Sequence, residues 1–475
     1  MPSTDPAGDL GTDLEARAAH TPARAGGRDA ARVAAQLLAP ALAAGLPTGR
    51  RAAMALAERA AADRRAIALL TELRDRYGPG PLRLDLGGRH IAVVLRAEDA
   101  RHVLDGTPDP YAPATGAGSA ASVRFRPYVH PYFPPHFRPH GVLTSHGTRR
   151  DERRAFNEGV LEYGQQLHSL APHFVRAVRE ETGRLLGAAT AGDGEIGWSA
   201  FREAWDRTAR RVVLGDAARD DTDLTATLGR LRSTRTATGP GDRFARRVRD
   251  HLDHAEPGSL AVEIARAAAS TAGGAGAVDP VGQVPHWLLA FEAAGTAAFR
   301  TLAVLATHEP QTGQVRGELA VTDLTEPHLL PYTRACVLES VRLWPTTPFL
   351  VRESVRDTVW GEETLPGGTQ FLIYAPLFHR DEALPYAHRF TPEIWLDGTA
   401  QDTEALMPFG AGPGECPGQD LVLLVASTTL AALLERHTYL PYRPGLLRPD
   451  RPLPRTLDHF GLRFVALPHI SRGWL

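Results

Sequence analysis

Near its C-terminal end the chain reads Phe409-Gly410-Ala411-Gly412-Pro413-Gly414-Glu415-Cys416-Pro417-Gly418, and an apolar run over residues 421–434 follows. The apolar run predicts a buried helix, so the glycine-rich loop brings Cys416 to the first turn of that helix. Unpaired N–H groups and the positive end of the helix dipole both favour a thiolate at such a place. We therefore expect the loop to hold a sulfur anion close to another group.

Several kinds of site use a glycine-rich loop. A dinucleotide-binding loop should follow a hydrophobic strand, whereas here Pro408 precedes the loop and Pro413 and Pro417 interrupt it. A Walker-type phosphate loop needs a lysine, and the chain contains none. Taken alone, the loop leaves three interpretations open: a thiolate that binds a metal, a nucleophilic thiolate, or a small buried cysteine in a turn.

The composition is ordinary for a soluble globular protein, with 43% hydrophobic residues, 23% charged residues and a formal net charge of −2. This balance gives no reason to expect binding to nucleic acid or to an anionic membrane. The two cysteines, Cys336 and Cys416, form neither a disulfide framework nor a C-x-x-C pair. A reducing cytoplasm fits this usage.

Neither a secretory signal nor a membrane span is expected. The N-terminus has no basic patch followed by an apolar stretch. The apolar run at 421–434 is too short to cross a bilayer, and the run at 286–306 carries Glu292 and Arg300 in its interior. Both runs are better interpreted as core helices of a large domain.

The periodicity of the chain predicts a mainly α fold with a minor β part. Residues 1–46 have few large apolar residues and predict a flexible N-terminal arm with one helix near residues 32–44, whereas 47–475 form a single large domain. Helical or alternating patterns predict helices at 48–77, 97–104, most of 148–306 and 331–343, and strands at 82–86, 90–95, 349–353, 358–360 and 369–374.

Residues 107–140 form a long segment with many prolines and aromatic residues and without periodicity. Two interpretations stay open. The segment is an irregular surface loop packed by its own rings, or it is a lid over an apolar pocket.

The cysteine loop resembles the haem-binding loop F-G-x-G-x-[R/H]-x-C-x-G of the cytochrome P450 superfamily. The resemblance implies that Cys416 is the proximal ligand of the iron of haem b, and that Phe409, Gly410 and Gly418 contact the haem. A thiolate ligand pushes electron density onto iron and favours O–O cleavage. Glycines let backbone N–H groups approach the sulfur and tune its donation.

Further motifs of the family follow in matching order. The segment Glu339-Ser340-Val341-Arg342 matches E-x-x-R, a pattern that alone would be an ordinary helix ion pair. The resemblance implies that Arg352, and His146 with Arg150, hold the haem propionates, because the arginine fork binds both oxygens of a carboxylate. Residues 390–395 resemble the F-x-P-E-R-[FW] segment of the family.

Two positions on the proximal side depart from the family pattern, although the resemblance extends over residues 47–475. Gly414 stands where the family has Arg or His, so propionate binding would depend on the other residues named above. Ile394 replaces the arginine that completes a triad with the E-x-x-R pair, and Arg389 and His388 are the neighbouring candidates to replace it.

The largest departure is in the helix predicted over residues 284–307. The family carries [A/G]-G-x-[D/E]-T-T there, whereas this chain reads Leu289-Ala290-Phe291-Glu292-Ala293-Ala294. Glu292 keeps the acid, but alanines replace both threonines, and Thr296 lies near the same helix face. We expect Glu292, Ala293 and Thr296 to mark a catalytic side with non-standard proton delivery. By the resemblance, the substrate pocket is formed by Ala290, Phe291, Gly295, Phe349 and Leu350.

The resemblance implies a monooxygenase-type oxidoreductase that oxidises an organic small molecule, bulky or partly aromatic, in natural-product biosynthesis. Electrons would come from a separate ferredoxin-type or flavodoxin-type protein. The missing threonines favour alternatives within the class, namely phenol-type or indole-type oxidative coupling, or oxidation driven by peroxide. Two further alternatives are a haem-binding partner protein without catalysis and a cysteine hydrolase, although no histidine stands out as a base for Cys416.

Overall fold

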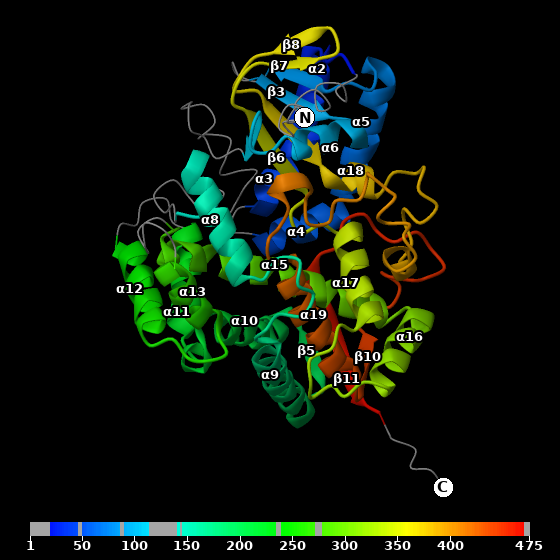
Figure 1. Cartoon of the computed structure of the whole chain (residues 1–475). Helices are drawn as coiled ribbons and strands as arrows, with labels where there is room; N and C mark the ends of the chain where they lie inside the picture. The colour runs from blue at the N-terminus through cyan, green and yellow to red at the C-terminus, as the bar shows by residue number, and fades with distance from the viewer. Residues whose placement is uncertain are drawn as a thin grey trace, which may run out of the picture.

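The structure is a computed structural model that describes residues 20–45, 50–85, 90–113, 140–142, 145–233, 239–270 and 278–469. Helices predominate in these residues, as predicted, and strands make up a smaller part. In Figure 1 the largest sheet and the N-terminal helices lie at one end of the molecule, and most of the other helices form the opposite end.

The helices have the following bounds. They are α2 (Gly27–Val33), α3 (Ala39–Gly45), α4 (Arg50–Arg59), α5 (Ala62–Tyr77), α6 (Ala97–Asp105), α8 (Gly147–Val160), α9 (Ala171–Ala191), α10 (Trp198–Leu214), α11 (Thr222–Ser233), α12 (Gly239–Asp253), α13 (Leu260–Ser270), α15 (Pro280–Leu305), α16 (Glu309–Ala320), α17 (Pro331–Leu343), α18 (Ala375–His379) and α19 (Gln419–Leu434). A π-helical stretch, η1 (Ala34–Leu38), joins α2 to α3, and shorter 3-10 segments include η4 (Pro392–Trp395) and η5 (Gly412–Gly414).

The strands form three sheets. They are β1 (Ala23–Arg24), β2 (Leu82–Asp85), β3 (His90–Val94), β4 (Tyr111–Pro113), β5 (Glu195–Gly197), β6 (Phe349–Ser354), β7 (Thr358–Trp360), β8 (Glu363–Leu365), β9 (Gln370–Tyr374), β10 (His437–Pro441) and β11 (Arg463–Pro468). The largest sheet has the order β1-β2-β3-β9-β6-β4, the second has β10-β11-β5, and β7 pairs with β8. The predicted hairpin of β2 and β3 is antiparallel.

Helix α15 runs through the helical part and contacts α10, α17 and α19. Its start is fixed by Asp279, whose side chain accepts a hydrogen bond from the Gly282 N–H, and by Pro280 in the first turn. Within the described residues, α15 alone is long and apolar enough to cross a membrane, and 83% of its most apolar stretch is buried inside the protein. This burial is typical of a core helix.

The N-terminal segment differs from the predicted flexible arm. Residues 20–45 form β1, α2, η1 and α3, and β1 pairs with β2 in the largest sheet. Val33, Leu37 and Leu38 are buried against α5 and the sheet. The prediction was wrong for this part because its few apolar residues recur on one face, which a composition argument does not detect. Residues 1–19 lie outside the described residues.

Two other predictions need comment. The helix predicted over residues 48–77 is divided into α4 and α5, because Ala61 has a left-handed backbone (φ 47°). Of the aromatic segment 107–140, the structure describes 107–113, which end in β4, and residue 140. The lid hypothesis concerns residues that mostly lie outside the described part.

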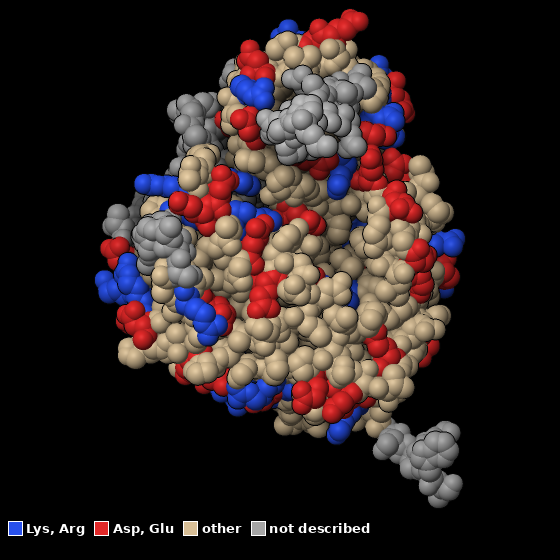
Figure 2. All heavy atoms as spheres, in the orientation of Figure 1, with Lys and Arg blue, Asp and Glu red and all other residues tan. Residues whose placement is uncertain are grey.

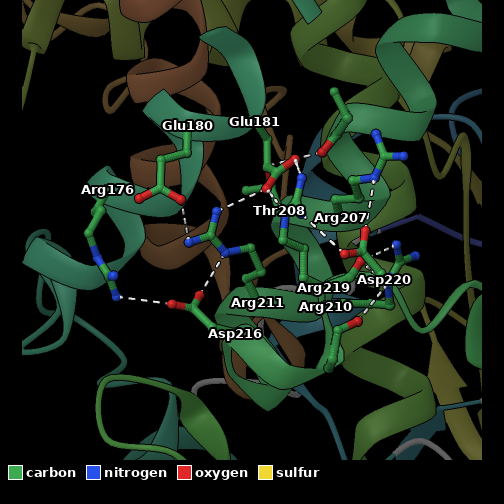
Figure 3. Close-up of polar contacts among 12 residues, drawn as sticks. Arg176, Glu180, Glu181, Arg207, Thr208, Arg210, Arg211, Asp216, Arg219 and Asp220 are labelled. Atoms are coloured by element: carbon green, nitrogen blue, oxygen red, sulfur yellow. Dashed lines mark hydrogen bonds and ion pairs between the residues drawn. The ribbon is translucent and has the colours of Figure 1, made fainter. Parts of the chain in front are cut away.

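Helices α9 and α10 are joined by a network of charged side chains (Figure 3). Glu181 on α9 is 1% exposed, and it accepts hydrogen bonds from Arg211 (2.9 Å) and Arg219 (2.6 Å). Arg211 also pairs with Glu180 at 2.8 Å and with Asp216 at 2.7 Å. Elsewhere, Figure 2 shows acidic and basic side chains interspersed on the face in view, consistent with the near-neutral composition.

We predict that Glu181→Gln lowers the free energy of unfolding by about 2 kcal/mol, because it leaves the buried Arg211 and the partly buried Arg219 without their shared carboxylate. Glu180→Gln is the matched control: Glu180 binds the same Arg211 but its side chain is 43% exposed, so we expect a loss below about 1 kcal/mol. Urea unfolding of both variants measures the difference, and equal losses would contradict the role of the buried network.

Candidate functional site

Two adjoining cavities lie beside α15. The first, of about 310 Å³, lies between α15 and the loop before α19, and Cys416 lines it; we call it the cysteine cavity. The second, of about 220 Å³, extends from α15 to α3, α4 and α5, and we call it the side cavity. Ala293, Thr346 and Thr347 line both cavities, so the two spaces meet at these residues.

The cysteine loop is held in one conformation by its backbone. The Cys416 N–H donates to the Phe409 carbonyl at 3.0 Å, which closes the loop. Gly410 and Gly412 have positive φ values of 82° and 62°, a region that other residues avoid. At Gly412 an added Cβ would also lie 2.6 Å from the Leu104 carbonyl oxygen, so the loop passes the end of α6 too closely for a side chain.

Cys416 lines the cysteine cavity, where its environment disfavours the negatively charged thiolate form. Burial raises the pKa of its thiol, and a hydrogen bond from the Gly418 backbone and the nearby Arg154 offset this rise in part. The thiol form is therefore preferred unless a cation is bound to the sulfur. A metal ion would supply that cation and would release the proton.

Three arginines, Arg150, Arg154 and Arg352, line the same cavity. Arg352 donates to the Thr107 hydroxyl at 2.8 Å and to the Val351 carbonyl at 3.1 Å, and it forms no ion pair with a carboxylate of the described residues. Burial, with a smaller effect of Arg150, lowers its pKa to about 10. Arg150 Nε is buried without a hydrogen-bond partner in the described chain. Arg150 pairs with Asp151 at 3.4 Å and Arg154 with Glu158 at 2.5 Å, so Arg352 is the arginine of this cavity without an ion pair in the described chain.

The face of α15 opposite Cys416 is apolar. Ala290, Phe291, Ala293 and Ala294 line the cysteine cavity. Near the start of the helix, Gln283 and His286 also line the cysteine cavity. The polar residues Glu292, Thr296 and Arg300 line the side cavity, together with Leu289 and Ala293.

Comparisons with known proteins agree with this geometry. The family model described as cytochrome P450 matches residues 311–449. The cyclooctat-9-en-7-ol 5-monooxygenase of Streptomyces melanosporofaciens is 39% identical over 119 residues, which cover 24% of this chain and 26% of that protein. The sugiol synthase of Salvia miltiorrhiza is 37% identical over 158 residues, covering 32% and 30%. The matched part thus spans under a third of these relatives.

The whole fold has a solved counterpart. The structure of cyanobacterial CYP120A1 with bound retinoic acid superposes with a TM-score of 0.66 and 17% sequence identity, over 84% of this chain and 94% of that one. The match extends over both the sheet and the helical part. The family match over residues 311–449 and the fold together support the cytochrome P450 superfamily for this chain.

The cofactor of this superfamily is a thiolate-ligated haem, and the residues of the cysteine cavity fit it. Cys416 would supply the thiolate. Arg150 and Arg352 are buried cations without a full set of partners, and the two carboxylates of a haem would provide the missing negative charge. Phe409, Gly410 and Gly418 also line the cavity, as does Leu350.

The structure assigns a different set of cations from the one that the sequence suggested. His146 is exposed at the start of α8 and does not line the cysteine cavity, so its expected contact with a propionate stays a prediction. Arg154, one turn after Arg150, lines the cavity instead and donates to the Glu415 carbonyl. Its spacing of four residues from Arg150 was the signal that the sequence analysis missed.

Gly414 is explained by Arg352. A Cβ added at Gly414 would lie 2.6 Å from Arg352 Nη2 and 3.2 Å from Thr107 Cγ2. The guanidinium of Arg352 thus occupies the space that a side chain at residue 414 would need. A cation from β6 thus lies at the loop position where the resemblance to the haem-binding loop would place an Arg or His.

The missing arginine at Ile394 is also compensated. Arg342 donates to both carboxylate oxygens of Glu339 at 2.7 and 2.6 Å, and both side chains are fully buried. Glu339 accepts two more hydrogen bonds, from the Trp395 indole at 3.1 Å and from the Thr391 N–H at 2.8 Å. The neighbour of Ile394 therefore supplies the donor, and neither of the two candidates named from the sequence does so.

The distal residues fall on two faces of α15. Glu292 forms ion pairs with Arg50 at 2.8 Å and with Arg202 at 3.5 Å, on the side-cavity face. The Thr296 hydroxyl donates to the Glu292 carbonyl at 3.1 Å and lines the side cavity. Ala293, where the two cavities meet, carries no hydroxyl.

Two of the expected pocket residues are placed differently. Phe349 lines the side cavity rather than the cysteine cavity. Gly295 lines neither cavity, because it packs against α10: an added Cβ would lie 2.7 Å from the Trp205 ring, whose indole donates to the Phe291 carbonyl at 2.6 Å. This contact corrects the expectation for Gly295.

We predict that Gly414→Ala reduces haem retention by roughly tenfold, because the new Cβ displaces the Arg352 guanidinium from its place beside the cavity. Gly159→Ala on α8 is the control, since an added Cβ there has no atom within 4 Å. The ratio of haem to protein after gel filtration, and the rate of haem transfer to apomyoglobin, measure the effect. Equal retention in the two variants would contradict the assigned role of Arg352.

Proposed function

We propose that the protein is a haem-thiolate monooxygenase that oxidises an organic small molecule with dioxygen and electrons from another protein. One observation carries this proposal: one cysteine and three buried or half-buried arginines line a single cavity. This cavity lies beside the mainly apolar helix α15 and meets a second cavity. The haem supplies the reductive activation of dioxygen, and the residues of the chain hold it and the substrate.

Each group of residues has a separate task in this proposal. Cys416 binds the iron, and Arg150, Arg154 and Arg352 neutralise the haem carboxylates. The apolar wall of α15 restricts water near the reacting centre. The substrate lies in the side cavity, with the atom to be oxidised near Ala293, because the two cavities meet there.

Proton delivery is proposed to follow a non-standard path. Ala293 carries no hydroxyl, and Thr296 uses its hydroxyl proton on the Glu292 carbonyl. Glu292 is the nearest carboxylate on the helix, but Arg50 and Arg202 hold it at the side cavity. We propose that Glu292 passes protons through water or through a polar group of the substrate.

The named relatives indicate the kind of substrate. The Streptomyces relative is a monooxygenase of cyclooctat-9-en-7-ol, and the solved relative binds retinoic acid. We propose an apolar, bulky substrate from natural-product biosynthesis, a cytoplasmic location, and a ferredoxin-type or flavodoxin-type donor that docks beside Cys416. Oxidative coupling or peroxide use is the second candidate, and the alanines at 293 and 294 favour it because these reactions need less timed protonation.

The first test concerns the thiolate. We predict that the ferrous carbon-monoxide complex shows the strongly red-shifted Soret band of thiolate ligation, and that Cys416→Ser abolishes this band. Cys336→Ala is the matched control, because Cys336 is buried within α17 away from the cavity. An unshifted band in the wild-type protein, or an unchanged band in Cys416→Ser, would overturn the proposal.

The second test concerns Glu292. We predict that Glu292→Gln lowers the amount of oxidised product per NADPH consumed by at least about tenfold, because an amide keeps the shape but carries no acidic proton. Incorporation of labelled dioxygen into product measures this ratio. Glu382→Gln is the control, because the Glu382 side chain is 74% exposed and has no part in the proposed proton path. Unchanged coupling in Glu292→Gln would contradict the proposed proton path.

A further inference from the structure

Arg300 is a buried arginine that forms no ion pair with a carboxylate of the described residues. It lies on α15, lines the side cavity and is 6% exposed. Its Nη1 donates to the Trp344 carbonyl at 3.0 Å and its Nη2 to the Leu457 carbonyl at 2.8 Å. Its Nε is buried without a hydrogen-bond partner in the described chain. Carbonyl groups fix the guanidinium in place, and the carboxylates of Asp63, Asp458 and Glu58 act on its charge only at longer range.

The other charged residues of the side cavity have partners. Arg50 pairs with Glu292, and Arg455 pairs with Glu382. The carboxylate of Asp63 accepts a hydrogen bond on each oxygen, from the Tyr374 hydroxyl at 2.5 Å and from the Thr456 hydroxyl at 2.6 Å. Among the described residues of this cavity, Arg300 is therefore the arginine that lacks a carboxylate partner.

Arg300 also stays charged. Burial lowers its pKa to about 10, with Asp63 opposing the shift, so the guanidinium is protonated at neutral pH. A buried cation is costly unless an anion or several hydrogen bonds compensate it. The rest of the cavity wall is largely apolar, with Leu37, Met54, Leu289 and Phe349. An amphiphilic molecule with one anionic end matches these two properties.

We propose that the side cavity binds an anionic substrate, of which the carboxylate or another acidic group is held by Arg300 while an apolar body extends toward Ala293. This inference rests on the proposed function and adds the substrate class. Arg300 thereby acts as a residue for specificity and positioning and has no part in the chemical step.

The helix geometry sets the length of such a substrate. Ala293 and Arg300 lie on the same side of α15, two turns apart, which corresponds to about 10 Å along the helix axis. The acidic group would therefore bind roughly 10 Å from the point where the two cavities meet. The oxidised carbon would be separated from the acid by several bonds, so short acids would fail to reach both positions.

The test uses the ferric holoenzyme and straight-chain fatty acids of increasing length, each compared with its methyl ester. Binding is measured by the change in haem spin state. For the chains that bind best, we expect the acid to bind at least about tenfold more tightly than its ester, although the ester is the more apolar molecule. If no acid of the series binds more tightly than its ester, the inference is overturned.

Variants separate Arg300 from general effects. Arg300→Gln should reduce the acid-to-ester ratio to near one, and Arg300→Lys, which keeps the charge, should preserve part of it. Arg455→Gln removes an arginine from the same cavity that already has a carboxylate partner, and it should leave the ratio near the wild-type value. The assignment of Arg300 to the acidic group would be contradicted if Arg300→Gln kept the wild-type acid-to-ester ratio. It would also be contradicted if only Arg455→Gln lost this ratio.

The outcome is distinguishable from a failure of the proposed function. If the red-shifted carbon-monoxide band is present but acid and ester bind equally, the haem-thiolate function stands and the anionic substrate is excluded. If Arg300→Gln fails to fold, as judged by circular dichroism, the wild-type ratio and Arg300→Lys together decide the question. The structural contacts of Arg300 with two carbonyls alone would not produce a preference for acid over ester.

Discussion

The fully buried ion pair of Glu339 and Arg342 imposes the strictest demand in the structure, because two opposite charges without access to water need every hydrogen bond satisfied. Arg342 meets this demand by donating to the main-chain carbonyls of residues 379, 386, 387 and 389, which lie in the segment that leads to the cysteine loop. His379 extends the connection: its Nδ1 lies 3.2 Å from the Arg342 carbonyl and its Nε2 accepts from the Met407 N–H at 3.0 Å. Burial, with a further effect of Arg342, lowers the pKa of His379 to about 3, so it stays neutral in this role. The position of the cysteine loop thus depends on an ion pair within helix α17.

Buried carboxylates need hydrogen-bond donors or cations, and in this protein these come from positions outside the expected motifs. Glu339 needs donors beyond Arg342, and an indole and a backbone N–H supply them where an arginine is absent. The haem carboxylates need cations, and Arg352 occupies the space beside Gly414 that would otherwise hold a side chain from the loop. The first replacement supplies neutral donors and the second supplies a cation, and in both the donor comes from a different sequence position. A motif that seems incomplete in sequence can therefore be complete in space.

The sequence predicted the parts that depend on local pattern. The apolar run after Cys416 forms α19, the hairpin of β2 and β3 forms where it was expected, and the order of motifs led to the correct superfamily. It did not predict features that arise from contacts between distant segments. Trp395 completes the Glu339 site across a separation of 56 residues, and β1 joins the sheet although its segment looked too polar to fold. The role of Gly414 was inaccessible for the same reason, since the guanidinium that fills its space comes from β6.

Helix α15 shows how one element serves two purposes. Most of the α15 residues that line the cysteine cavity are small or aromatic apolar groups, and none of them carries a hydroxyl. The face toward the side cavity carries Glu292, Thr296 and Arg300, in a helix that is otherwise apolar and mostly buried. Polar side chains in such a place cost free energy, and Glu292 recovers it through Arg50 whereas Arg300 finds only carbonyl groups. A buried charge that the protein itself does not neutralise destabilises the fold unless a ligand compensates it, so its presence favours a function in binding. The acid and the hydroxyl of this helix, Glu292 and Thr296, therefore lie at the side cavity, where we propose that the substrate binds.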